Sequence, residues 1–145
     1  MPKSMTLTTI AACLGLLGTL AGAPAHASGI VVVAHAESAI GTLSREQVTH
    51  IFLGRLKRLP NGESVTAVEV EALRERFYKR LIGRDIAEIN AYWARLQFSG
   101  RTQPPPRLTS SEAALAAVLA DRNAVAHLES DPLDPRVKVV FRLEP

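Results

Sequence analysis

The sequence predicts an α/β protein in which helices flank a mixed, mainly parallel sheet. Short apolar runs rich in β-branched residues alternate along the chain with amphipathic stretches of helical period, and this alternation is typical of α/β layers. The first run, residues 30–34 (IVVVA), is continuously apolar, as expected of a strand covered on both faces. No internal repeat, low-complexity segment or second domain boundary interrupts the pattern, so residues 28–145 are expected to form one domain.

Residues 44–70 are predicted to form one helix–loop–strand unit, beside which the other elements pack. Ser44 with Gln47 fits a capping box, and Gly54 is placed to end the helix that the box begins. A basic loop and an Asn-Gly turn then lead to a strand predicted at residues 65–70. The apolar stripe of the helix consists of Val48, Ile51 and Phe52.

Two further helices follow this unit. The helix predicted at residues 72–82 ends at Gly83, and its apolar residues Leu73, Phe77 and Leu81 are spaced by four. Asp85 with Glu88 forms a second capping box, from which a helix is expected to run to about residue 98. Its core face is predicted to carry Ile86, Ile89, Trp93 and Leu96.

The last third of the chain is predicted to hold one helix and two strands. Residues 103–106 (QPPP) are expected to be a stiff, extended connection. Thr109 with Glu112 is placed to open the last helix, and strands are predicted at residues 125–128 and 137–143. The core face of this helix is expected to be Leu115, Val118 and Leu119.

Residues 1–27 have the features of a cleavable export signal. Lys3 precedes an apolar, uncharged run, and residues 25–27 (AHA) have the small-x-small form that signal peptidase cleaves. The run falls short of the ~18 to 20 apolar residues of a membrane span. The alternative is a lipoprotein box ending at Cys13, which is disfavoured because the more hydrophobic segment, LGLLGTL, follows that residue. We therefore expect a periplasmic protein that is not stably inserted in the membrane after cleavage.

The composition of the mature chain excludes several classes of function. Removing 27 of 145 residues leaves 118, without a cysteine, and lowers the net charge from +3 to +2. This charge is too small to indicate a nucleic-acid partner. No nucleophile elbow, glycine-rich phosphate loop or carboxylate pair is present, so neither an enzyme nor a cofactor is expected. His35, His50 and His127 lack metal-ligand spacing, so no metal site is expected either.

Several segments together carry a family resemblance. The first three are IFLGR at residues 51–55, NGE at 61–63 and the V-x-V strand after them. Three more follow downstream: LRERF at 73–77, AYWARLQFSGR at 91–101 and SEAALAAVLA at 111–120. In their order and spacing these segments resemble short, single-lobe relatives of the substrate-binding proteins of phosphate ABC importers. The resemblance covers most of the chain after residue 30. It implies a single lobe of the periplasmic binding-protein fold, a small oxyanion such as phosphate as ligand, and an ABC permease as partner.

The resemblance also points to an anion contact. Arg74 and Phe77 match an arginine and a phenylalanine of the family, but the Gly-Ser element expected before them is replaced by Glu71 and Ala72. Glu71 suits a helix N-terminus and would repel phosphate. Arg74 is therefore a candidate ligand residue, and the alternative is a solvated helix residue that pairs with Glu71 or Glu75.

The loop after the first strand offers two more candidates, His35 and Ser38. Binding sites of open α/β sheets lie at the carboxyl ends of strands, and these residues follow such an end. The sequence is compatible with two functions. The first is a solute-binding module for a small oxyanion. The second is a lobe that has lost its ligand and serves as an exported interaction or accessory domain beside an envelope protein.

Overall fold

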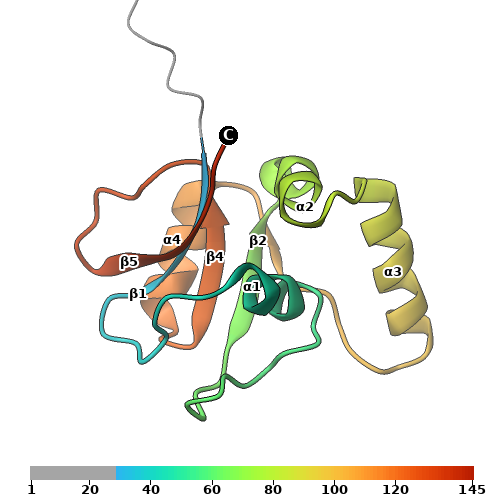
Figure 1. The fold of residues 1–145 in the computed structure, drawn as a ribbon, viewed down its shortest axis with the longest axis horizontal. Coiled ribbons are helices and arrows are strands. Elements are labelled where there is room, and N and C mark those ends of the chain that lie inside the picture. The colour runs from blue at the N-terminus through green and yellow to red at the C-terminus, as the bar shows by residue number, and fades with distance from the viewer. Residues whose placement is uncertain (1–28) are drawn as a thin grey trace, which may run out of the picture.

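A computed structural model describes residues 29–145, so the predicted signal at residues 1–27 lies outside the described part of the chain. The chain forms one open sheet with helices on both faces (Figure 1). In chain order the elements are β1 (Ile30–His35), α1 (Arg45–Phe52), β2 (Thr66–Val70), the 3₁₀ turn η1 (Glu71–Leu73), α2 (Arg74–Ile82), α3 (Ile86–Phe98), β3 (Arg107–Leu108), α4 (Ser111–Ala120), β4 (Ala124–Leu128) and β5 (Val137–Leu143).

The sheet has the strand order β3-β2-β4-β1-β5. β2 is parallel to both β3 and β4, whereas β1 is antiparallel to both β4 and β5. Four strands therefore run in one direction and β1 runs against them, which confirms the prediction of a mixed, mainly parallel sheet. The carboxyl end of β1 consequently lies at the amino ends of the other strands.

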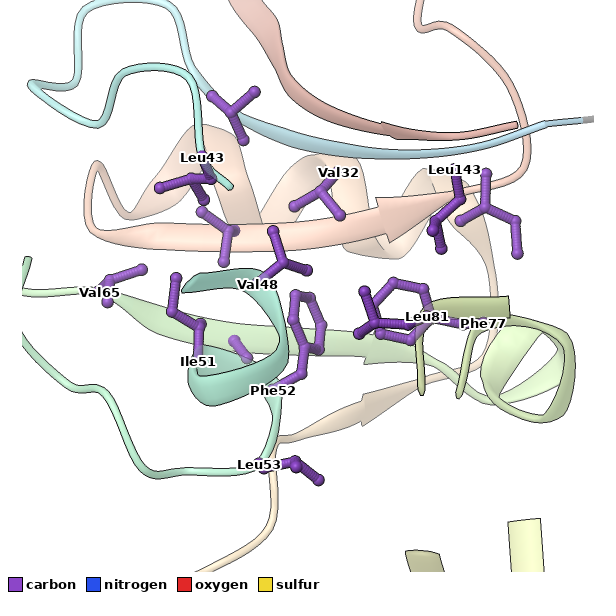
Figure 2. Packing of buried hydrophobic residues seen from close by; sticks show 14 of the residues in the cluster. Val32, Leu43, Val48, Ile51, Phe52, Leu53, Val65, Phe77, Leu81 and Leu143 are labelled. Carbon is purple, nitrogen blue, oxygen red and sulfur yellow. The ribbon is translucent and has the colours of Figure 1, made fainter. Parts of the chain in front are cut away.

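The helices divide between the two faces of the sheet. α1 and α2 cover one face, α3 packs on α2, and α4 covers the other face (Figure 1). Figure 2 shows Phe52 of α1 and Phe77 of α2 between the helices and the sheet, and their rings meet edge-on with centroids 4.7 Å apart. Trp93 of α3 is buried in the same cluster, as the helical period predicts.

Local signals place most helix ends correctly. The capping boxes of Ser44 with Gln47 and of Asp85 with Glu88 are both formed. Gly83 follows α2 with a φ of +69°, a left-handed conformation that favours glycine.

Several boundaries differ from the prediction. Residues 71–73 form a 3₁₀ turn, so the helix predicted from residue 72 begins as an α-helix only at Arg74. The cap of α4 is Ser110 rather than Thr109, because the Ser110 hydroxyl accepts from the Ala113 N–H at 3.1 Å. Ala114 and Val118 are the buried residues of α4. The predicted core residues Leu115 and Leu119 are only partly buried.

Candidate functional site

The strongest concentration of buried polar groups lies where β2 passes into α2. β2 ends at Val70, so Glu69 sits near its carboxyl end, and the short η1 turn brings Arg74 back toward that carboxylate. We call the following five residues the Glu69–Arg74 cluster: Glu69, Arg74, Tyr78, Asn90 and Arg107. They come from β2, α2, α3 and β3.

Glu69 is the centre of this cluster. Arg74 Nε donates to Glu69 Oε2 at 2.6 Å, and the hydroxyl of Tyr78 makes a short hydrogen bond to the other carboxylate oxygen. Arg74 Nη2 also donates to Asn90 Oδ1 at 3.2 Å. Arg107 Nε lies 4.0 Å from Glu69 Oε2, at the rim of the cluster, where its side chain is 39% exposed. The carboxylate therefore has donors on both oxygens.

Burial makes this ion pair different from a surface pair. The side chains of Arg74 and Glu69 are only 2% and 1% exposed. Desolvation raises the pKa of Glu69, and the Tyr78 hydrogen bond and the Arg74 charge oppose this rise. Desolvation and the nearby carboxylate also raise the pKa of Tyr78, so its hydroxyl remains a donor. Removing either charge would leave the other buried without its counter-ion.

His127 of β4 lies on the apolar side of the cluster. Its ring stacks on Phe77 with centroids 4.4 Å apart, and neither ring nitrogen has a hydrogen-bond partner within residues 29–145. Desolvation, with the Arg74 charge as the second cause, lowers the pKa of His127 to about 3. The imidazole is therefore neutral at neutral pH and acts as part of the core.

The prediction that Arg74 is a solvated helix residue is wrong. Its main partner is Glu69, whereas Glu71 Oε1 lies 3.9 Å away at the edge of ion-pair distance. A buried carboxylate five residues earlier thus occupies the guanidinium that was a candidate for an incoming anion. Glu71, with a side chain 57% exposed, keeps a negative charge at the start of α2.

The other two candidates, His35 and Ser38, do not join Arg74. They follow β1, whose antiparallel direction places them at the edge of the sheet opposite the carboxyl ends of β2 and β4. His35 Nδ1 accepts from the Glu37 N–H at 3.1 Å. Ser38 is buried, and its carbonyl accepts from Lys138 Nζ at 2.7 Å. The three predicted residues therefore do not form a single site.

Sequence reasoning missed Glu69, Tyr78, Asn90 and Arg107. A signal was present for Glu69, because a charged residue inside a strand buried on both faces requires a counter-ion, and Arg74 follows five residues later. Tyr78 stands one helical turn after Arg74. Among residues 29–145, no group of three or more His, Cys, Asp or Glu side chains is placed to hold a metal ion.

No protein-family model matches the sequence, and no curated protein matches it either. Solved structures do match the fold. An ABC-type phosphate transport receptor from Vibrio cholerae is similar with a TM-score of 0.58 and 18% sequence identity, over 77% of this chain and 45% of the receptor. A phosphate ABC transporter substrate-binding protein from Clostridium perfringens, with bound phosphate, is similar with a TM-score of 0.60 and 18% identity, over 77% of this chain and 44% of that protein.

These comparisons confirm the predicted fold. The chain shares the α/β architecture of phosphate ABC transporter substrate-binding proteins and spans less than half of their length, as expected of a single-lobe relative. Both similar structures are transport proteins rather than enzymes. In the described part of the chain, no helix is long and apolar enough to cross a membrane.

Proposed function

We propose that this protein is an exported, binding-protein-like domain related to phosphate import that holds no free oxyanion at Arg74 and serves as an interaction or accessory module. The observation that carries the proposal is the buried ion pair between Arg74 and Glu69. A phosphate at Arg74 would have to displace a carboxylate that already receives donors on both oxygens. It would also meet the charge of Glu71.

The extent of the similarity supports the same proposal. Two-lobed binding proteins hold their ligand between lobes, in a cleft that closes and excludes water. The described domain corresponds to less than half of such a protein, so it would supply only one side of such a cleft. An anion on one open face would compete with water for every donor.

Location and partner belong to the proposal as well. Cleavage after Ala27 would release the domain into the periplasm, where the natural partners are an ABC permease or another envelope protein. The domain would act by binding rather than catalysis, because Glu69, Arg74 and Tyr78 are engaged with one another and His127 is enclosed in the core.

Small-oxyanion binding is the second candidate. It is favoured by the phosphate bound in the Clostridium perfringens protein and by Arg107, which is partly exposed at the rim of the cluster. Arg107 Nε lies 3.7 Å from Glu71 Oε2, so an anion at this position would have to compete with that carboxylate.

Thermal unfolding of the protein comprising residues 28–145 separates the two candidates. A ligand at a hundred times its Kd stabilises a protein by about 2.7 kcal/mol, which gives a clear melting shift. We expect millimolar phosphate to shift Tm no more than sulfate or chloride at matched ionic strength. A saturable, phosphate-selective shift that is lost in Arg107→Ala would instead support oxyanion binding. Arg107 is suited to this test because it is a partly exposed residue outside the buried pair.

A further inference from the structure

A groove of about 510 Å³ follows the outer edge of the first half of β2 and ends beside Glu69 of the Glu69–Arg74 cluster. Three segments form its walls: the loop after α1, the first half of β2, and the chain between α3 and β3, which Figure 1 shows returning to the sheet beside β2. Its lining includes Gly54, Lys57, Ala67, Trp93 and Pro104–Pro106.

The edge of β2 is paired at both ends of this groove and open between them. The Val65 N–H donates to the Lys57 carbonyl at 3.1 Å, and the Glu69 N–H donates to the Pro106 carbonyl at 2.9 Å. The Thr66 N–H points the other way, to the Asn123 carbonyl before β4. Because strand residues alternate in direction, the N–H and C=O of Ala67 face the groove.

The proline run keeps this gap open. β3 pairs with β2 only from Glu69 onward, so it does not reach Ala67. Pro104–Pro106 line the groove opposite the strand and have no N–H to donate to the Ala67 carbonyl. At about 3.3 Å per residue, the positions of Val65 and Glu69 are separated by about 13 Å, which is room for a few residues of extended chain.

The walls are suited to an apolar side chain and one negative charge. A Cβ added to Gly54 would lie 2.8 Å from Trp93 Cη2, so the glycine allows the indole to approach the loop closely. Pro104–Pro106, which are partly or fully exposed, give the groove its apolar surface, and the buried side chains of Ile51 and Trp93 border it from the core. Among the described residues, Lys57 is the one charged residue that lines the groove. It has no ion-pair partner within residues 29–145.

We propose that this groove binds an extended segment of another polypeptide, which pairs with the backbone of Ala67 and places a carboxylate at Lys57. This inference gives a surface to the interaction module proposed above and rests on that proposed function. The mode is β-strand addition, in which main-chain hydrogen bonds supply affinity and the flanking walls supply specificity. A small oxyanion fits less well, because the Ala67 carbonyl would repel it and the apolar walls would remain unused.

The test is an NMR titration of the protein comprising residues 28–145. The probe is an acetylated tetrapeptide, Ser-Val-Thr-Val, with a free C-terminal carboxylate. Saturable changes are expected at the Ala67 amide and the Trp93 indole. Methylating the central amide nitrogens of the peptide should abolish them. Amidating the C-terminus should weaken binding about fivefold, the contribution of one partly exposed ion pair.

Matched variants identify the two contacts. Lys57→Gln should weaken the binding of the free-acid peptide by the same factor. The variant should bind the amidated peptide with the same affinity as the unaltered protein. Thr102→Trp, which fills the groove from its rim, should abolish binding. Lys79→Gln changes an exposed lysine on α2 and serves as the control.

Three results would overturn the inference. The first is the absence of a saturable change at the Ala67 amide with up to 10 mM peptide. A Kd of about 10 mM is about the weakest that such contacts would give. The second is the same set of changes with inorganic phosphate alone, which would indicate an oxyanion site. The third is a change that follows protein concentration rather than peptide, which would indicate a second copy of the chain. Phosphate-selective stabilisation that depends on Arg107 would instead overturn the proposed function, so the two failures are distinguishable.

Discussion

Replacing Arg74 by methionine should destabilise the domain far more than breaking an exposed ion pair. The Glu69 carboxylate would remain buried, with only the Tyr78 hydroxyl as a close donor. Breaking a buried pair by removing one partner costs about 3 to 5 kcal/mol, a large part of the roughly 5 to 15 kcal/mol that stabilises a domain. Arg74→Met is therefore expected to remove a substantial fraction of the free energy of unfolding in one step.

The double variant Glu69→Gln with Arg74→Met should recover most of this loss. It removes both charges, and the amide oxygen that replaces the carboxylate can still accept from Tyr78. We expect it to lie within about 1.5 kcal/mol of the unaltered protein, since neutral replacement of a buried pair is often nearly neutral in stability. The two single variants and the double variant form a cycle that gives the coupling energy directly.

Urea denaturation followed by circular dichroism at pH 7 measures the cycle. With an m-value of about 1 to 3 kcal/mol per molar urea, the loss in Arg74→Met should lower the midpoint by at least about 1 M. Arg142→Met is the matched control, because Arg142 contacts Asp131 at the same 2.6 Å with both side chains 52% exposed. Its midpoint should be nearly unchanged. If Arg74→Met behaved like this control, the buried pair would not be the centre of the site.

Three further predictions concern the core, acid stability and export. Trp93→Ala should lower the free energy of unfolding, measured by urea denaturation, by about 3 to 5 kcal/mol, because the indole is 2% exposed in the main core. An unchanged midpoint would contradict the burial of Trp93. His127 has a native pKa of about 3 against 6.5 unfolded, so the unfolded state alone binds its proton as pH falls from 6.5 toward 3. Stability should therefore fall by about 1.6 kcal/mol from this group between pH 6.5 and 5, and His127→Phe should lose that part of the slope while His50→Gln keeps it. Protein recovered from its native host should begin at Ser28 by intact mass; a chain that began at an acylated Cys13, or at Met1 in the cytoplasm, would refute the export signal.

Local chemistry explains what the sequence predicted well. The capping boxes at Ser44 and Asp85 use groups three residues apart, so their geometry follows from the sequence alone. The burial of Trp93 follows equally from its place on a helical period. The error of one residue at the start of α4 arose because Thr109 and Ser110 are both good caps, and backbone geometry selects between them.

Non-local pairing explains what the sequence could not predict. Nothing within residues 30–34 states that β1 runs against its neighbours, yet this direction separates His35 and Ser38 from Arg74. The partner of Arg74 depends likewise on the tight η1 turn, which folds the start of α2 back over Glu69. The two residues are close in the chain, but only the turn geometry makes them partners.

The most direct test of the account is the NMR signal of the Arg74 Nε–H group during a phosphate titration. This hydrogen is bonded to Glu69 and shielded from solvent, so its signal should be slow to exchange and should shift in Glu69→Gln. With up to 10 mM phosphate, we expect it to remain in place, because the guanidinium is already satisfied by the protein's own carboxylate. A saturable, phosphate-specific movement of this signal would show that Arg74 is available to an anion and would contradict the central claim.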